Sequence, residues 1–318
     1  MPSVLFKAVG NAEIGLGHVS RVTSLIRALP PDWSYIFHIN DNLFVKQFLA
    51  DRKINFECGD AIQLLRAHRF DRLIYDELVV EEKFLDEAKA QEIPLLGALD
   101  FFFYEQPLVD VIVNLFNQNS SASRPALSSG IRYFEGLKYA IISSKFQRNQ
   151  KRETGSLKNI LIMYGGADQN RNTKRTLAFL NGLNISLKID VIVGPLNPSK
   201  DEILSTACGS HHEIKIFENP EELVKIMGRA DAAFTGCGTT CFELGFLGVP
   251  SIVIPQNLPE QRLAKALGAR GVVLTGENID ACWESLSCRQ TRLELAAKAK
   301  CLFDGRGAER ILSCFEMH

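Results

Sequence analysis

Residues 234–255, FTGCGTTCFELGFLGVPSIVIP, combine a glycine loop, the start of a helix and a carboxylate about one helical turn further on. Two glycines let a ligand approach the backbone, and the first amide groups of the helix have no partner within it. Such a helix end attracts a diphosphate, and a carboxylate on the same helix face could accept both hydroxyls of a ribose. The glycines alone also fit an ordinary strand-to-helix turn. The pattern predicts nucleotide-binding residues at Gly236, Cys237, Gly238, Thr239, Thr240 and Glu243.

A second glycine turn, in NAEIGLGHVSR, places a histidine at the start of a helix. Gly15 and Gly17 keep the approach open, and the helix N-terminus tends to hold His18 neutral. A neutral imidazole can take a proton from water or from a hydroxyl near pH 7, so His18 is our candidate general base. The alternative is a histidine that caps its helix. Arg21 lies on the same helix face and could hold a phosphate or pair with a carboxylate.

A third loop, YGGADQNRNT, also runs from a strand into a helix. The backbone at Gly165 and Gly166 could line a sugar or a phosphate, and Asp168 could accept hydrogen bonds from sugar hydroxyls. The alternative for Asp168 is a helix cap.

Three further polar side chains follow predicted strands. Asn257 and Gln261 come after the buried strand at 250–255, and their amides could donate to sugar hydroxyls. Asp76 ends another predicted strand and is a candidate on the acceptor side. Each of these residues also fits an ordinary loop or turn.

Strand-like and helix-like segments must position these residues, and their alternation predicts an α/β fold with parallel sheets covered by helices. Helical patterns occur at 18–29, 42–52 and 81–91 in the first half. The predicted strands are 3–9, 34–39, 72–78, 94–100 and 109–115 in the first half, and 159–166, 187–194, 212–218, 231–236 and 250–255 in the second.

The polar run QRNQKRETGSLK separates the two halves of the pattern and predicts two Rossmann-like domains. We assign 1–146 to an N-terminal acceptor and catalytic domain, 147–158 to the linker, 159–300 to a C-terminal nucleotide-sugar-binding domain, and 301–318 to a terminal helix. All three glycine turns follow strands, and ligands bind at the carboxyl ends of parallel strands. We therefore expect both sheets to face an interdomain cleft that holds the ligand.

The composition narrows the choice of partners. The 318 residues are 46% hydrophobic and 23% charged, and the formal net charge of −1 provides no overall basic field for nucleic acid. The first apolar run is too short for a signal peptide, and no apolar stretch reaches about 18 residues, so we expect a cytoplasmic protein without a membrane span. The eight cysteines form no C-x-x-C pair, so we expect no structural metal. The oligomeric state stays open.

Taken together, the turns resemble those of the nucleotide-sugar hydrolase of pseudaminic acid biosynthesis and of related predicted glycosyltransferases of spore-coat polysaccharide synthesis. Both belong to the two-domain glycosyltransferase-B (GT-B) superfold. The resemblance runs nearly end to end, through IGLGHVSR, GLKYAIISSKF, MYGGADQNRNT, the segment from FENPEELVKIM to SIVIP, and DGRGAERI. It implies that residues 236–240 hold a UDP diphosphate, that Glu243 holds the ribose, and that His18 activates water. UDP enters as part of a substrate, and no separate cofactor is implied.

Two motifs depart from the hydrolase pattern on the sugar or acceptor side. Lys7 and Val9 stand where that pattern has an arginine and an aspartate, and its Asp-x-Tyr appears here as Asp76-Glu77-Leu78. We expect a UDP-sugar hydrolase that breaks the anomeric C–O bond and releases UDP and a free amino sugar. The alternatives are a UDP-sugar-dependent glycosyltransferase that uses a hydroxyl acceptor, and a non-catalytic nucleotide-sugar-binding protein.

Overall fold

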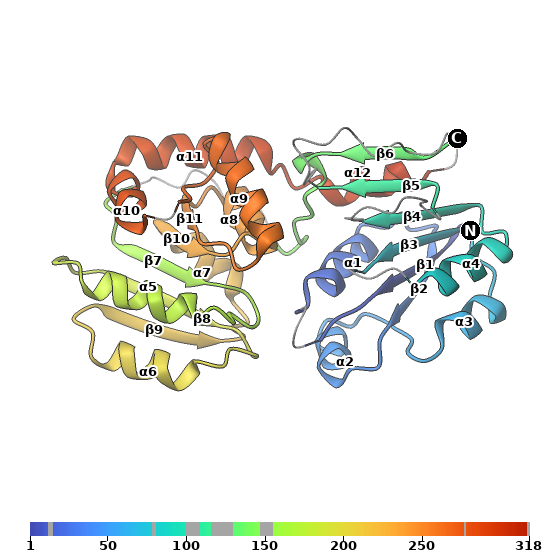
Figure 1. The fold of residues 1–318 in the computed structure, drawn as a ribbon, viewed down its shortest axis with the longest axis horizontal. Helices are drawn as coiled ribbons and strands as arrows, with labels where there is room; N and C mark the ends of the chain where they lie inside the picture. Colours follow the sequence, from blue (N-terminus) through green and yellow to red (C-terminus); the bar gives the residue numbers. More distant parts are fainter. Residues whose placement is uncertain are drawn as a thin grey trace. The chain divides into compact units, whose positions relative to one another are not determined.

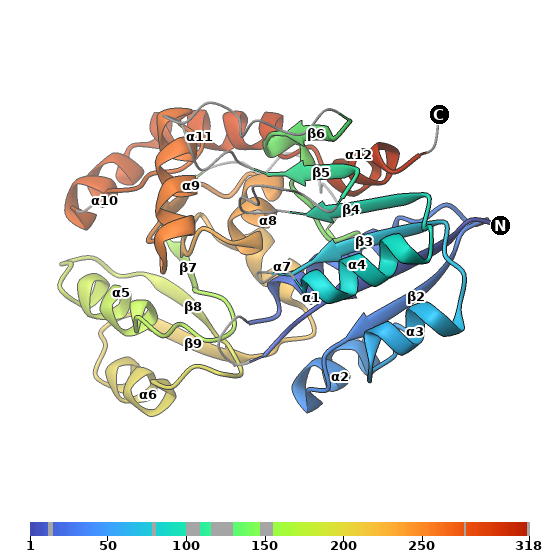
Figure 2. The ribbon, with the colours of Figure 1, turned by 45° about the vertical axis from the view of Figure 1, so that its right-hand side comes forward.

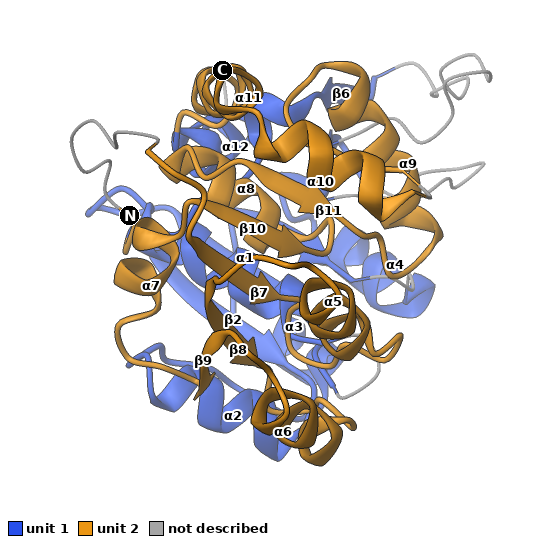
Figure 3. Cartoon of the chain, turned by 90° about the vertical axis from the view of Figure 1, so that its left-hand side faces the viewer, with its two compact units in different colours: residues 1–144, 305–318 blue, residues 145–304 orange. Residues whose placement is uncertain are grey.

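The computed structural model describes residues 1–11, 15–77, 81–99, 109–115, 130–146, 155–276 and 278–316. The chain divides into two compact units, coloured separately in Figure 3. Unit 1 contains Met1–Ser144 and Gly305–His318, and unit 2 contains Lys145–Asp304. Residues 147–154, which include most of the predicted linker, lie outside the described residues.

Unit 1 is built on a six-stranded parallel sheet, labelled in Figure 1. Its strands lie in the order β2-β1-β3-β4-β5-β6, so β2 and β3 lie on opposite sides of β1. The strands are β1 (Ser3–Ala8), β2 (Ser34–Ile39), β3 (Arg72–Asp76), β4 (Leu95–Leu99), β5 (Val111–Asn114) and β6 (Arg132–Glu135). The helices are α1 (Gly17–Arg27), α2 (Leu43–Ala50), α3 (Ala61–Ala67), α4 (Glu82–Ala90) and α12 (Gly307–Cys314), with a 3-10 turn η1 (Leu137–Tyr139).

Helices cover both faces of this sheet because its strands are apolar on both sides. Along β1, Val4 and Phe6 join the core under α1, α2 and α12, whereas Leu5 joins the core under α3 and α4. Figure 2 shows α4 lying against β3 on that second side. Side chains of one strand alternate between the faces, so neighbours in sequence serve different layers.

The helix α12 returns to unit 1 after the chain has passed through unit 2. Its Ile311 and Leu312 lie in the core under α1, and Phe315 is fully buried there. The ring of Phe315 occupies the space where a side chain at Gly97 would stand, since a Cβ there would lie 1.8 Å from the ring. Arg72 donates from Nε to the carbonyl oxygen of Phe315 at 2.7 Å. The end of the chain therefore completes the core of the first unit.

Unit 2 is a five-stranded parallel sheet in the order β11-β10-β7-β8-β9. Phe234 of this sheet stacks on Trp283, with ring centroids 6.1 Å apart. The strands are β7 (Asn159–Met163), β8 (Lys188–Val193), β9 (Glu213–Glu218), β10 (Ala232–Thr235) and β11 (Ser251–Val253). The helices are α5 (Asn172–Asn181), α6 (Lys200–Cys208), α7 (Leu223–Arg229), α8 (Thr239–Leu247), α9 (Leu258–Ala269), α10 (Ile279–Ser287) and α11 (Arg289–Leu302).

The α/β class with two parallel sheets is confirmed, and every predicted strand has a counterpart. The sequence analysis did not name the strand β6, the helices α3, α6, α7 and α10, or most of α11. The predicted terminal segment at 301–318 contains the end of α11 and then α12, with the break at 303–306. No helix in the described ranges is long and apolar enough to cross a membrane.

Candidate functional site

The helix α1 places His18 directly above the carboxyl end of β3. Its Nδ1 lies 2.7 Å from Oδ1 of Asp76, which is fully buried. Nδ1 also lies 3.1 Å from a guanidinium nitrogen of Arg21, but the shorter contact is with a carboxylate, which only accepts hydrogen bonds when ionised, so we assign the imidazole proton to Nδ1. Nε2 has no hydrogen-bond partner among the described residues and is available to take a proton. With its proton on Nδ1, the imidazole is oriented to act as a general base through Nε2.

Asp76 also binds Arg21, one turn further along α1. Arg21 donates from Nε to Oδ2 at 2.8 Å and from a second nitrogen to Oδ1 at 2.5 Å. Burial opposes ionisation, but the charge of Arg21 and the hydrogen bond from His18 outweigh it and lower the pKa of Asp76 to about 2. Both carboxylate oxygens are thus occupied within the protein. This corrects the expectation that Asp76 faces an acceptor, and it selects the carboxylate-pairing alternative for Arg21 over phosphate binding.

The glycine turn before α1 keeps open space around His18. A Cβ at Gly15 or at Gly17 would meet nothing within 4 Å. Gly15 has a φ of +74°, and its amide donates to the carbonyl of Asn11 at 2.9 Å, so it also closes a turn. No described side chain therefore fills the space beside Gly15 and Gly17, next to His18.

The opposite face of the sheet carries a different polar group at the same strand ends. Nζ of Lys7 lies 2.6 Å from Oε1 of Glu77, and the hydroxyl of Tyr75 donates to Oε2 at 2.9 Å. Burial raises the pKa of Glu77, and Lys7 opposes this effect. Lys7, which stands where the hydrolase pattern has an arginine, thus forms a buried ion pair with Glu77. Val9 is half-buried, and Leu78 lies outside the described residues.

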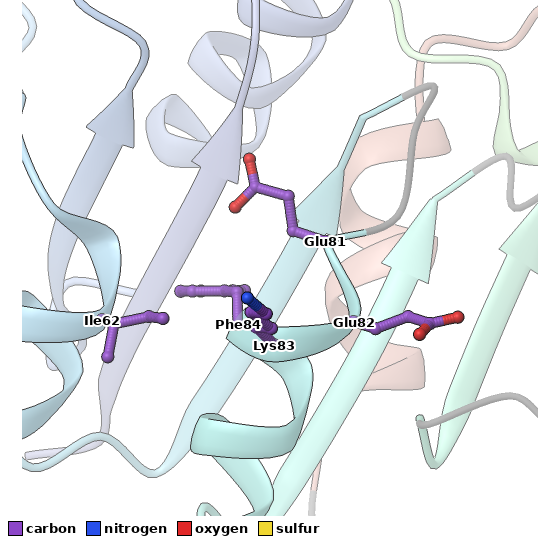
Figure 4. A pocket seen from close by; sticks show the side chains of 5 residues that line it. All are labelled: Ile62, Glu81, Glu82, Lys83 and Phe84. Atoms are coloured by element: carbon purple, nitrogen blue, oxygen red, sulfur yellow. The ribbon is translucent and has the colours of Figure 1, made fainter.

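A surface pocket of about 420 Å³ lies at the start of α4 on this face. It is lined by Ile62, Glu81, Glu82, Lys83 and Phe84. Glu81 is 3.2 Å from Nζ of Lys7, and the two carboxylates of the pocket point away from each other (Figure 4). These side chains do not converge on one point, so we assign the pocket no ligand.

In unit 2, the helix α8 begins where the sequence predicts. Gly238 is its N-cap and makes no side-chain capping bond, so the first amides of the helix lack a protein acceptor from a cap. Gly238 is exposed, and a Cβ there would meet nothing within 4 Å. The helix ends at Gly248, whose φ is +74°. The backbone at 238–240 is therefore open to an anion.

Glu243 lies on α8 one turn after this N-terminus. No described residue forms a hydrogen bond or an ion pair with its carboxyl group. Desolvation by the surrounding protein raises its pKa to about 8. A half-buried carboxyl group that has no partner among the described residues is suited to a ligand that brings its own hydrogen-bond donors, such as a ribose diol.

The first half of the same loop, Gly236 and Cys237, is in contact with side chains of the protein. The amide of Cys237 donates to Oε2 of Glu260 at 2.9 Å. Gly236 is buried, and a Cβ there would lie 3.0 Å from Nε2 of Gln256 and 3.1 Å from Oε2 of Glu260. Gly236 therefore makes room for protein side chains, and the Cys237 amide is not free for a phosphate. The amide of Cys237 thus has a protein partner that the sequence did not predict, Glu260, and the role of Gly236 in nucleotide binding stays a prediction.

The loop after β7 also has one part that contacts the protein and one part that borders open space. Asp168 is only 2% exposed, and its two oxygens accept the amides of Asn172 and Thr173, each at 2.8 Å. The N-cap residue of α5 is Arg171, but the side chain of Asp168 accepts the first two amides of the helix, so the contacts favour the helix-cap alternative over a sugar contact. At Gly165 and Gly166, by contrast, a Cβ would meet nothing within 4 Å. The space beside these two glycines is therefore open, although the carbonyl oxygen of Gly166 accepts the amide of Leu196 at 2.9 Å.

Asn257 and Gln261 lie at the start of α9. The side chain of Asn257 accepts the amide of Glu260 at 2.9 Å and caps the helix. Gln261 is exposed. Asn257 thus has a structural role, whereas the side chain of Gln261 is available for a ligand. Among the described residues, no group of three or more His, Cys, Asp or Glu could hold a metal ion.

No protein-family model matches the chain. The chain is 30% identical over 275 residues to an uncharacterized protein of Methanocaldococcus jannaschii, covering 78% of the chain but 54% of that relative. It is 24% identical to the spore coat polysaccharide biosynthesis protein SpsG of Bacillus subtilis, over 97% of the chain and 96% of SpsG. It is 25% identical, over 76% of the chain and 42% of the relative, to the pseudaminic acid cytidylyltransferase and UDP-2,4-diacetamido-2,4,6-trideoxy-beta-L-altropyranose hydrolase of Helicobacter pylori.

Solved structures identify the fold. MurG of Acinetobacter baumannii superimposes with a TM-score of 0.72 at 15% identity, over 98% of this chain and 99% of MurG. The spinosyn forosaminyltransferase SpnP gives a TM-score of 0.65 at 10% identity, over 99% of this chain and 100% of SpnP. The protein is therefore an α/β protein of the GT-B fold. Within that fold it is distantly related to SpsG and to the Helicobacter protein that includes a UDP-sugar hydrolase.

Proposed function

We propose that the protein is a UDP-sugar hydrolase. The observation that carries this proposal is the imidazole of His18, which is fixed through Nδ1 by the buried Asp76 and has an available Nε2. In unit 2, the open amides at 238–240 and the unpartnered Glu243 would hold the diphosphate and the ribose. The distant hydrolase relative supports uridine as the base.

In the proposed reaction, His18 Nε2 takes a proton from water as the water oxygen attacks the anomeric carbon. The C1–O bond to the diphosphate breaks, and its electron pair leaves with UDP. The amides at the N-terminus of α8 stabilise the charge that develops on the departing diphosphate. The products are UDP and a free sugar of inverted anomeric configuration. The carboxylate of Asp76 stabilises the imidazolium while it exists.

A glycosyltransferase is the second candidate, because a solved transferase shares the fold over the whole chain. The same base would then deprotonate a hydroxyl of an acceptor. Incubation of the pure protein with UDP-sugars in the absence of an acceptor separates the two activities, with UDP measured by chromatography and the sugar anomer by NMR. Release of UDP and free sugar supports the hydrolase. Release that strictly requires an added acceptor rules the hydrolase out.

Glu243 gives this proposal a test that does not depend on turnover. Its pKa of about 8 means that it is largely protonated at pH 7 in the free protein. Ribose hydroxyls that donate to the carboxylate favour the ionised form, so UDP binding at pH 7 is expected to release close to one proton. Affinity should then rise with pH up to about 8, by at most about tenfold per unit.

Calorimetry of UDP binding at pH 7 in two buffers of different ionisation enthalpy measures this release. The variant Glu243→Gln cannot lose the proton and corrects for ionisation of the UDP phosphate. Equal proton release by the wild-type protein and the variant would show that Glu243 does not contact the ribose.

A further inference from the structure

Two side chains connect three loops at the carboxyl ends of β11, β10 and β7. Oε2 of Glu260 accepts the amide of Cys237, after β10, and the amide of Gln256, after β11, each at 2.9 Å. The side chain of Gln256 donates to the carbonyl of Tyr164, after β7, at 3.0 Å. These three strands are neighbours in the sheet, so the three loops meet at one edge.

Further contacts tie the same loops. Nδ2 of Asn170 donates to the carbonyl oxygen of Gln256 at 2.7 Å. The backbone amide of Glu260 is itself held by the cap from Asn257. The absence of a side chain at Gly236 makes this network possible, since a Cβ would come within 3.1 Å of Oε2 of Glu260. Glu260 is thus fixed at both its backbone and its side chain.

We propose that Glu260 is a positioning residue that holds the glycine loop after β10 in the shape that receives the diphosphate. The inference rests on the proposed function and deepens it. By fixing the Cys237 amide, Glu260 assigns that amide to the protein and leaves those of Gly238, Thr239 and Thr240 to the ligand. The loop is ordered before UDP arrives, so binding does not have to bear the entropy cost of ordering it.

The geometry distinguishes a positioning role from a purely electrostatic one. Both amides donate to the same oxygen, Oε2, and Oε1 has no hydrogen-bond partner among the described residues. A glutamine side chain also carries one acceptor oxygen, so Glu260→Gln can keep both bonds. Glu260→Ala removes both. The negative charge itself repels a nearby diphosphate, so its loss should not weaken UDP binding.

The test compares wild-type protein, Glu260→Ala, Glu260→Gln and a control, Lys265→Ala, which changes an exposed residue one turn further along α9. Amide hydrogen exchange of the ligand-free proteins reports on the loop, and calorimetry reports UDP affinity. We expect faster exchange at Cys237 and Gln256, and about tenfold weaker UDP binding, in Glu260→Ala alone. Glu260→Gln should bind UDP at least as tightly as the wild-type protein.

Unchanged exchange and unchanged UDP affinity in Glu260→Ala would overturn the inference. Loss of affinity in both Glu260→Ala and Glu260→Gln would also overturn it, because the charge and not the acceptor would then matter. A wild-type protein that does not bind UDP contradicts the proposed function. In that case the exchange rates still decide whether Glu260 orders the loop.

Discussion

Replacement of His18 by alanine is expected to lower the turnover of a UDP-sugar by about 10²–10⁴-fold, the range that a positioned general base contributes. The affinity for UDP should stay within about twofold, because no proposed nucleotide contact belongs to unit 1. Single-turnover measurements with saturating protein separate the chemical step from binding. The reason for the large effect is that water alone is a poor nucleophile at neutral pH without a base beside it.

The matched control is His68→Ala, which removes an exposed histidine of the same unit. It should leave turnover unchanged. Undiminished turnover in His18→Ala would remove His18 from the catalytic role. Asp76→Asn should also slow turnover, because the asparagine amide can donate to Nδ1 and place the proton on Nε2, which is then unable to accept one.

Replacement of Asp76 by alanine is expected to destabilise unit 1 by about 3–5 kcal/mol at pH 7, the usual cost of removing one partner of a buried ion pair. The substitution would leave the charge of Arg21, whose side chain is only 12% exposed, beside His18 without its carboxylate. The two tryptophans, Trp33 and Trp283, lie in different units. Urea unfolding followed by the fluorescence of Trp33, in a Trp283→Phe background, therefore measures the affected unit.

The pH dependence of this stability has a definite sign. The folded-state pKa of Asp76 is about 2, below its ordinary value of 3.8, because Arg21 and His18 outweigh the effect of burial. The stabilisation is therefore complete above about pH 4 and is lost as the pH falls toward 2, with a magnitude on the order of 2 kcal/mol. The difference between the wild-type protein and Asp76→Ala should narrow over that range. Asp86→Ala, an exposed change on α4, should show no such narrowing.

The alternation of strands and helices was predictable because each element has its own spacing of apolar residues along the chain. Apolar runs such as the segments around Val4 and Phe234 are buried on both faces of parallel sheets, and this pattern differs from that of the surface helices. The end of α8 was also predictable, since the left-handed backbone at Gly248 favours glycine, and its start follows the glycine loop. The strand β6 was not predictable because its sequence, RYFE, is half-buried along its whole length and lacks the apolar run of equally short strands such as β10.

The partners within the candidate site were not predictable in the same way. His18 and Asp76 are 58 residues apart, and Cys237 and Glu260 are 23 apart, so only the strand order brings each pair together. A helix cap was an alternative for Asp168 because aspartate often caps helices, although the amides it accepts lie four and five residues further on, beyond the spacing of an ordinary N-cap. No comparable clue marks Glu260, which looks like any acidic residue in the first turn of a helix.

The return of α12 to the first unit has a consequence for synthesis on the ribosome. Unit 2 is one continuous stretch, Lys145–Asp304, whereas the core of unit 1 needs Ile311, Leu312 and Phe315. The unit that is translated first is therefore the one that is finished last. During translation, the unit that contains His18 has an incomplete hydrophobic core at the time when the unit that contains Glu243 can already fold. We therefore expect a chaperone to bind the exposed apolar surface of unit 1.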